Sequence, residues 1–231
     1  MNSASVLIIG GYGTFGGRLA RLLAEEPRLT LLIAGRSVQK AQAFCGKLGG
    51  IAHTQAVAFD RNGDAAQQMA RIKPDLVVDA SGPFQAYGAN VYRVVEACMA
   101  LGVPYIDLAD DPRFVEGIAQ FDDAAKKAGI FVLSGVSTVP TLSTAVIRRL
   151  SNELATISDI RGGIAPSPFA GVGLSVVTAI ASYAGKPLHI RHNGRETKAA
   201  ALIDSQHYTI APPGRLPLRR MRFSLVDVPD L

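Results

Sequence analysis

Cysteine is scarce in this sequence, which has only Cys45 and Cys98 among 231 residues. Two cysteines can form neither a disulfide framework nor a metal site by themselves, so we expect a reducing, cytoplasmic environment. Both cysteines fall on the apolar faces of predicted helices, which indicates core residues rather than reactive thiols. The four histidines are scattered along the chain, and we therefore expect no metal site.

Long hydrophobic runs are also absent. The longest mostly apolar stretch, residues 171–185, is interrupted by Gly, Ser and Thr and is too short to span a bilayer. The N-terminus has no basic segment followed by a cleavable apolar segment, so a signal peptide is not expected. No internal period appears, which argues against a repeat architecture. These absences predict a soluble protein with no membrane partner.

Positive charge is present but is not arranged for binding nucleic acid. The net charge is +5, and residues 186–231 hold eight basic and four acidic side chains. A surface that binds nucleic acid needs clustered basic residues with aromatic side chains for stacking between them. Only Tyr208 and Phe223 stand among these arginines. We therefore expect no nucleic-acid partner.

Short apolar runs alternate with amphipathic segments from Ser5 to about Leu150, a pattern typical of βαβ units that build a parallel sheet. The predicted strands are residues 6–9, 29–34, 55–59, 76–79, 104–108 and 130–133. The segments between them place apolar residues at helical spacing. The predicted fold class is α/β, with a Rossmann-type doubly wound parallel sheet in residues 1–150.

The pattern changes near Leu150 and predicts a second, smaller α+β unit in residues 151–231. Residues 156–165 look extended and 174–183 helical, and Asn193-Gly194 stands between extended flanks as a hairpin signal. Because exposed strand edges tend to be covered, we favour a homodimer over a monomer with charged edges. The sequence ends without a terminal helix or polar tail, which leaves open that the unit is truncated and the chain a piece of a longer protein.

A glycine-rich motif directly follows the first predicted strand and opens the first predicted helix. Gly11, Gly13 and Gly16 form the G-x-G-x-x-G spacing of dinucleotide-binding folds. They permit a tight turn, close approach of the backbone to a pyrophosphate, and close packing of the helix on the strand, while free amides at the helix start bind the anion. The predicted cofactor contacts are Gly10, Gly11, Tyr12, Gly13, Thr14, Phe15 and Gly16. A glycine-rich turn without a ligand is the alternative.

The acidic residue that binds the ribose 2′-hydroxyl of NAD is missing about 20 residues beyond Gly16, where the chain has Arg36, Ser37 and Lys40. A guanidinium with a hydroxyl and an ammonium beside it suits a 2′-phosphate, so NADP is the predicted cofactor. The alternative is a solvated Arg36 and a Ser37 that only caps a helix. Asp60, after the third strand, could accept a hydrogen bond from adenine or cap the following turn.

Polar residues follow the fourth, fifth and sixth strands at the edge where ligands bind in open α/β sheets. Ser81, Gly82, Pro83 and Phe84 are expected to border the nicotinamide end of the cofactor, with Tyr87 beside them. Tyr87 and Asp107 are the candidate catalytic residues. Asp107, Asp110 and Asp111 could bind a cationic substrate or act as acid and base, but they could equally cap helices, since Pro112 marks a first helical position.

Five segments together resemble the saccharopine dehydrogenase-like family in order and spacing, over about residues 5–150. The segments are 10–16, 34–36, 79–84 with Gly88, 105–108, and 134–137 with Pro140. The absence of Tyr-x-x-x-Lys counts against the short-chain dehydrogenases, which also carry glycine-rich first turns.

The resemblance implies an NADP-binding domain followed by part of a substrate domain whose sheet often forms dimers. It implies an NAD(P)-dependent oxidoreductase that transfers hydride between NADP(H) and a small substrate, with an imine or amine carbon as a candidate centre. Gly11, Gly13, Gly16 and Arg36 would hold the cofactor. Members of this family usually run well beyond 231 residues. The alternative is a non-catalytic NADP-binding regulatory or scaffold protein, because the sequence shows no convincing proton donor.

Overall fold

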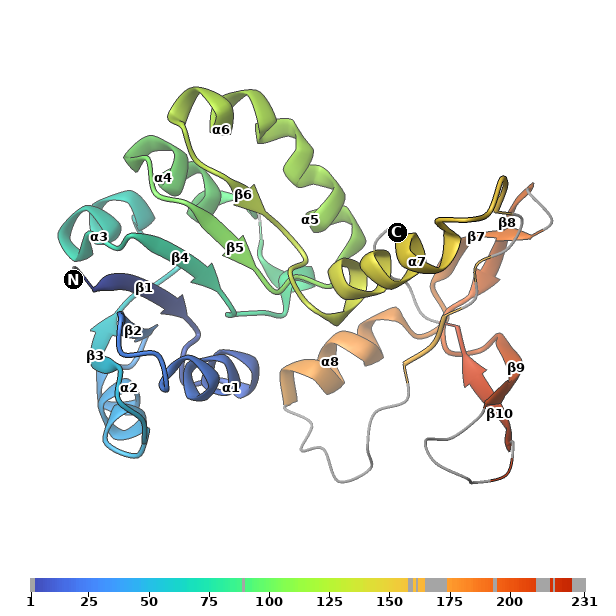
Figure 1. The fold of residues 1–231 in the computed structure, drawn as a ribbon, viewed down its shortest axis with the longest axis horizontal. Coiled ribbons are helices and arrows are strands. Elements are labelled where there is room, and N and C mark those ends of the chain that lie inside the picture. Colours follow the sequence, from blue (N-terminus) through green and yellow to red (C-terminus); the bar gives the residue numbers. More distant parts are fainter. Residues whose placement is uncertain are drawn as a thin grey trace. The chain divides into compact units, whose positions relative to one another are not determined.

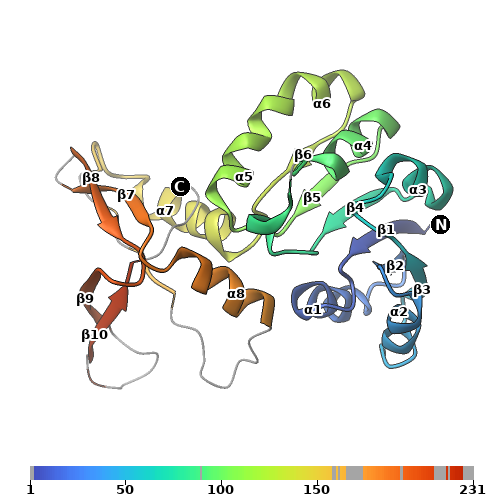
Figure 2. The ribbon, with the colours of Figure 1, turned by 180° about the vertical axis from the view of Figure 1, so that it is seen from behind.

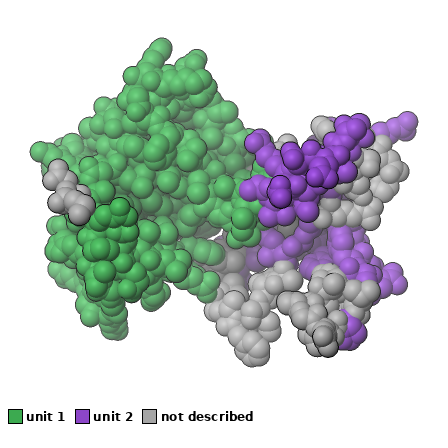
Figure 3. Space-filling view, viewed as in Figure 1, with its two compact units in different colours: residues 1–144, 229–231 green, residues 145–228 purple. Residues whose placement is uncertain are grey.

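The computed structural model describes residues 3–88, 90–157, 160, 162–164, 174–192, 195–210, 217 and 219–225. The chain divides into two compact units, drawn in different colours in Figure 3. Unit 1 comprises residues 1–144 with 229–231, and unit 2 comprises residues 145–228.

A parallel sheet of six strands forms the centre of the described part of unit 1, in the order β3-β2-β1-β4-β5-β6. Its strands are β1 (Ala4–Ile9), β2 (Leu29–Gly35), β3 (His53–Ala58), β4 (Leu76–Asp79), β5 (Tyr105–Asp107) and β6 (Val132–Leu133). The chain runs outward from β1 to β3, returns to the centre at β4, and continues to β6. The order therefore reverses between β1 and β4, which is where ligands bind in doubly wound folds. The predicted Rossmann-type fold class is confirmed.

Helices cover both faces of this sheet (Figures 1 and 2). They are α1 (Thr14–Leu23), α2 (Val38–Cys45), α3 (Ala65–Ile72), α4 (Arg93–Leu101), α5 (Pro112–Gly117) and α6 (Asp122–Ala128). The two faces form because neighbouring residues of a strand point to opposite sides. Val6 and Ile8 pack with residues of α1 and α2, whereas Leu7 and Ile9 pack with residues of α3 and α4. Burial of each such side chain stabilises the fold by roughly 1.5–3 kcal/mol.

Unit 2 contains α7 (Ser143–Ser151), most of which lies in it, α8 (Leu174–Tyr183) and two antiparallel pairs. Strands β7 (Pro187–His192) and β8 (Arg195–Ala200) pair so that His192 lies opposite Arg195, whereas β9 (Ser205–Ile210) pairs with β10 (Arg219–Ser224). The predicted hairpin is present, although its turn residues 193–194 lie outside the described residues, as do 226–231. The described residues of the predicted extended segment 156–165 form neither helix nor strand. No described helix is long and apolar enough to cross a membrane.

The turn between β1 and α1 depends on two glycines. Gly10 has a φ of +75°, in the left-handed region that favours glycine. At Gly16 an added Cβ would lie only 2.3 Å from the carbonyl oxygen of Gly10. Backbone therefore touches backbone where α1 crosses the end of β1.

Replacing Gly16 with alanine should destabilise the chain. A methyl group against a backbone oxygen forces α1 away from the turn, and overpacking of this kind costs about 1–3 kcal/mol. Gly46→Ala is the matched control, because the nearest atom to its added Cβ is 3.5 Å away and the substitution should be neutral or slightly stabilising. Urea unfolding of both variants measures the difference. Equal stabilities would contradict the close approach seen at Gly16.

Candidate functional site

The first loop is tied to the end of the neighbouring strand. The amides of Gly10 and Gly11 both donate to the carbonyl of Ala34, at 2.9 and 3.1 Å, and the amide of Gly13 donates to the carbonyl of Gly10 at 2.8 Å. Gly13 is the N-cap of α1, makes no side-chain cap hydrogen bond, and no acidic residue stands in the first turn. The start of α1 therefore offers amides and a positive helix end to an anion.

The glycine spacing fits a dinucleotide. Gly13 is exposed, and an added Cβ there would have only one close neighbour, the carbonyl oxygen of Gly10 at 3.0 Å. Gly11 and Gly16 are buried, Tyr12 and Thr14 are half-buried, and Phe15 is exposed. The loop is thus packed tightly against β1 underneath and open above Gly13, as the approach of a pyrophosphate requires.

Tyr12 connects this loop to the end of β2. A Cβ on Gly35 would lie 2.5 Å from the Tyr12 ring, and the Ser37 amide donates to the Tyr12 hydroxyl at 3.2 Å. No role for Gly35 is evident from the sequence, because its close contact is with a residue 23 positions earlier in the chain. Arg36 and Lys40 are exposed beside it.

Ser37 and Asp60 are candidate cofactor contacts for which capping was the alternative interpretation. The structure shows both of them capping. Ser37 Oγ accepts from the Lys40 amide at 3.3 Å and caps α2. Asp60 Oδ1 accepts from the Asn62 amide at 3.0 Å in the turn after β3. Both side chains remain partly or fully exposed, so these caps do not prevent contact with a ligand.

The turn after β4 is held by Asp79, which is fully buried. Its Oδ1 accepts from the amide of Ser81 at 2.9 Å and from the Ser81 hydroxyl at 2.6 Å. The hydroxyls of Ser81 and Tyr87 are 3.0 Å apart. A Cβ on Gly10 would lie 2.8 Å from Ser81 Cα. The structure therefore brings the glycine loop and the Ser81 turn together at the point where the strand order reverses.

Arg61, from the loop after β3, reaches this turn from another direction. Its Nε lies 3.8 Å from Asp79 Oδ2, and its guanidinium carbon is 3.1 Å from the centre of the Tyr87 ring. Burial raises the pKa of Asp79, and its contacts with Ser81 and Arg61 oppose that rise. Neither Asp79 nor Arg61 has a function that the sequence alone predicts. The one signal was an acid ending an otherwise apolar strand.

Tyr87, one of the two candidate catalytic residues, faces inward. Its ring packs 4.6 Å from Phe84 and 5.8 Å from Phe114, measured between centroids. Burial and the nearby Asp79 carboxylate raise the pKa of Tyr87 well above its ordinary value, so the phenol stays protonated. Gly82 and Pro83 are half-buried, whereas Phe84 is buried beneath the turn.

Asp107, the other candidate, lies beside Asp79 in the register of β4 and β5 and is also fully buried. Its Oδ1 accepts from the Ser134 hydroxyl, the Gly135 amide and the Ala109 amide, at 2.8–2.9 Å. Its Oδ2 is buried and has no hydrogen-bond partner among the described residues. Burial raises the pKa of Asp107 to about 6, and the Asp79 carboxylate contributes to the rise.

The remaining acids of this edge have structural partners. Asp111 accepts from the Phe114 amide at 3.1 Å and caps α5, with Pro112 at the first helical position, which is the capping role anticipated for it. Asp110 accepts from the Gln85 amide nitrogen at 3.0 Å. Among the described residues no group of three or more His, Cys, Asp or Glu could hold a metal ion.

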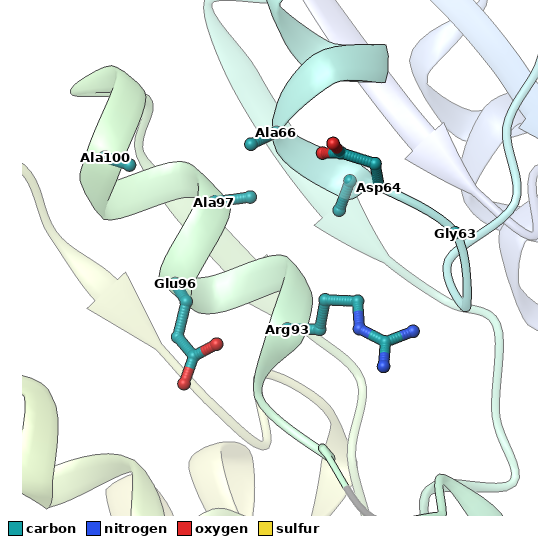
Figure 4. A pocket seen from close by; sticks show the side chains of 8 residues that line it. Gly63, Asp64, Ala66, Arg93, Glu96, Ala97 and Ala100 are labelled. Carbon is teal, nitrogen blue, oxygen red and sulfur yellow. The ribbon is translucent and has the colours of Figure 1, made fainter.

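A hollow lies apart from these contacts, between α3 and α4 (Figure 4). It is lined by Gly63, Asp64, Ala65, Ala66, Arg93, Glu96, Ala97 and Ala100. Arg93 donates to the carbonyl of Asn62, and Asp64 caps α3 through the Gln67 amide. None of the residues singled out by the sequence lines this hollow.

Residues 6–133 match the model of the saccharopine dehydrogenase NADP-binding domain. The chain belongs to this family. The match identifies NADP as the cofactor and confirms the expected resemblance. It covers every predicted cofactor contact, from Gly10 to Phe84, and both candidate catalytic residues.

Two curated relatives resemble the chain over part of its length. The "Saccharopine dehydrogenase-like oxidoreductase" of Rattus norvegicus is 27% identical over 152 residues, which are 58% of this chain and 35% of the rat protein. The "Putative trans-acting enoyl reductase Rv2449c" of Mycobacterium tuberculosis is 32% identical over 114 residues, 48% of this chain and 26% of that protein. The chain therefore spans about a third or less of the curated relatives it matches.

Among the solved structures that resemble this chain, one extends over parts of both units. Saccharopine dehydrogenase (L-Glu forming) from Saccharomyces cerevisiae, in its apo form, superposes with a TM-score of 0.65 at 14% identity. The likeness covers 91% of this chain and 48% of the yeast chain. At this identity it shows a shared fold.

The burial of Asp107 predicts a pH-dependent contribution to stability. Because the pKa rises from 3.8 to about 6 on folding, the native chain binds this proton more tightly than the unfolded chain. The resulting stabilisation is full below about pH 4 and is lost as the pH rises through 6, a change of about 3 kcal/mol.

Asp107→Asn removes this titration and keeps an oxygen that can accept from Ser134 and Gly135. The unfolding free energy of the parent minus that of the variant should therefore fall by roughly 2–2.5 kcal/mol between pH 4 and pH 7. Urea unfolding at several pH values measures this difference. A difference that stays constant over the range would contradict the shifted pKa.

Proposed function

We propose that this chain is the cofactor-binding part of an NADP(H)-dependent oxidoreductase that transfers hydride between the cofactor and a small substrate. The observation that carries the proposal is the contact between Gly10 and Ser81. It joins a loop suited to a pyrophosphate to a polar turn at the reversal of strand order. The family match and the names of the curated relatives support the same reaction class.

Each part of the site has a separate role in this proposal. The amides at the start of α1 bind the pyrophosphate, and Gly13 leaves room for it. Arg36 pairs with the 2′-phosphate, assisted by Ser37 and Lys40, and Asp60 contacts the adenine end. Ser81, Gly82 and Pro83 border the nicotinamide ribose, with Phe84 and Tyr87 packed behind them. Bound NADPH would supply the hydride.

For the substrate we propose a polarised double bond at carbon, with C=N as the first candidate. The resemblance to saccharopine dehydrogenases favours an imine, and the shared fold is compatible with it. A C=C bond is the second candidate, because the mycobacterial relative is named for enoyl reduction. Oxidation of NADPH by cyclic imines and by enoyl thioesters, followed at 340 nm, separates the two.

A non-catalytic, NADP-sensing protein is the competing proposal, and one observation favours it. The side chains of Tyr87 and Asp107 are both buried, and each is engaged with neighbouring residues. A protein of this kind would bind NADPH and leave it unoxidised with either class of substrate. Turnover with either class would rule it out.

The preference for NADP rests on Arg36. NADPH should raise the melting temperature of the chain more than NADH does, because a ligand at a hundredfold excess over its Kd stabilises the native state by about 2.7 kcal/mol. Arg36→Asp should reverse the order of the two cofactors, since a carboxylate repels the 2′-phosphate and accepts from a 2′-hydroxyl.

Arg71→Asp is the matched control for charge, because Arg71 is exposed on α3, away from the first loop. The Arg71→Asp variant should prefer NADPH over NADH to the same extent as the parent. Thermal shift measurements with both nucleotides test the three proteins. Equal or greater stabilisation of the parent by NADH would rule out the NADP preference.

Gly13→Val should abolish nucleotide binding and leave the fold intact. The backbone of Gly13 is extended, with a φ of −78°, so valine fits the conformation while its methyl groups fill the space needed by the pyrophosphate. Gly49→Val is the control, because no atom lies within 4 Å of an added Cβ there. Calorimetric titration with NADPH measures binding, and circular dichroism checks the fold. Unchanged affinity in Gly13→Val would place the binding site elsewhere.

A further inference from the structure

Asp79 occupies a particular place in the sheet. It is the last residue of β4, and its register partners are Ile9 on β1 and Asp107 on β5. Ile9 directly precedes the glycine loop. The Asp79 carboxylate is completely buried, and a buried charge is expensive unless it is paired and hydrogen-bonded.

The contacts of Asp79 set the direction of a hydrogen-bond chain. The Ser81 hydroxyl donates its one proton to Asp79 Oδ1 at 2.6 Å, so at 3.0 Å it accepts from the Tyr87 hydroxyl. A charged acceptor makes the Ser81 contact short and strong. The carboxylate therefore determines where the Ser81 turn lies and which way its hydroxyl points.

Arg61 completes this arrangement from outside the turn. Its side chain is only 11% exposed, and its Nε lies 3.8 Å from Asp79 Oδ2, at ion-pair distance. The guanidinium stacks on the Tyr87 ring, and an Nη donates to the carbonyl of Val91 at 3.3 Å. Arg61 thus opposes the charge of Asp79 and contacts the ring of Tyr87 at the same time.

These contacts lie on one side of the proposed cofactor site. Arg61, Asp79, Ser81 and Tyr87 surround the turn after β4, whereas Gly13 and Arg36 belong to the loops after β1 and β2. No described hydrogen bond joins Arg36 or the amide of Gly13 to these four residues. A buried ion pair often contributes less stability than apolar residues of the same volume, so its presence at this edge points to a role in placing the turn.

We propose that Asp79 and Arg61 are positioning residues, which hold the Ser81 turn for the nicotinamide half of NADPH and leave the binding of the adenosine half unaffected. The proposal rests on the proposed function. According to this inference, different residues hold the two halves of the cofactor. The adenosine half depends on the first loop and Arg36, and the nicotinamide half depends on the buried pair.

Truncated ligands test this separation on the full chain. Adenosine 2′,5′-bisphosphate keeps the 2′-phosphate and the adenine but lacks the nicotinamide half. Asp79→Asn preserves the size of the side chain and removes the charge that pairs with Arg61. We expect Asp79→Asn to weaken NADPH binding by tenfold or more and the bisphosphate by less than twofold, measured by calorimetry. The fluorescence of bound NADPH, which reports on the nicotinamide, should change in the same variant.

Asp75→Asn is the matched control. Asp75 precedes β4 at its other end and accepts from the amide and hydroxyl of Ser5, at 2.7 and 2.8 Å, so it makes similar contacts far from the turn. Its affinities for both ligands should equal those of the parent. Tyr87→Phe is a second variant that keeps the ring beneath Arg61 and removes only the hydroxyl. It should weaken NADPH by a few fold and leave the bisphosphate unchanged, which keeps the test decisive if Asp79→Asn does not fold.

The outcomes distinguish this inference from the proposed function. A parent chain that binds neither ligand overturns the proposed function and the inference with it. A parent that binds both ligands, together with variants that weaken the two equally or not at all, overturns the positioning role alone. Selective loss of NADPH, with the bisphosphate retained, supports it.

Discussion

The carboxyl edge of the sheet depends on two buried carboxylates that lie side by side, Asp79 at the end of β4 and Asp107 at the end of β5. A buried charge requires donors, and here the donors come from the loops that follow the strands. Asp79 accepts hydrogen bonds from the Ser81 amide and hydroxyl, and Asp107 accepts from the Ser134 hydroxyl and the Gly135 amide. Each carboxylate therefore adds hydrogen bonds that fix the loops at this edge of the sheet.

The two carboxylates are compensated differently, which gives them different properties. Arg61 lies beside Asp79 at ion-pair distance. Asp107 receives three neutral donors on one oxygen, and no donor from the described part of the chain reaches the other. A cation favours the ionised form, and neighbouring negative charge opposes it. Burial raises the pKa of both carboxyl groups, that of Asp107 to about 6, and the Arg61 guanidinium opposes the rise at Asp79.

In the proposed function, the glycine loop and the Ser81 turn bind different halves of the cofactor. The loop is shaped by close backbone contacts, with Gly16 against Gly10 and Gly10 against Ser81. Its proposed role in binding a pyrophosphate follows from the open space above Gly13. The turn is shaped by side-chain charge and hydrogen bonds. Although the chain spans about a third of its curated relatives, both parts of the proposed nucleotide site lie within the described residues.

The sequence by itself determined the alternation of strands and helices, the α/β class and the glycine motif, because strand and helix periods and glycine spacing are local properties of the chain. It also left the correct capping alternatives open for Ser37, Asp60 and Asp111. Only the tertiary structure decided that Arg61 reaches Asp79, that Tyr12 covers Gly35, and that Tyr87 points inward. These contacts join residues 18 and 23 positions apart, or bury a side chain beneath a turn. They follow from the order of strands in the sheet and the packing of its loops, which no local pattern encodes.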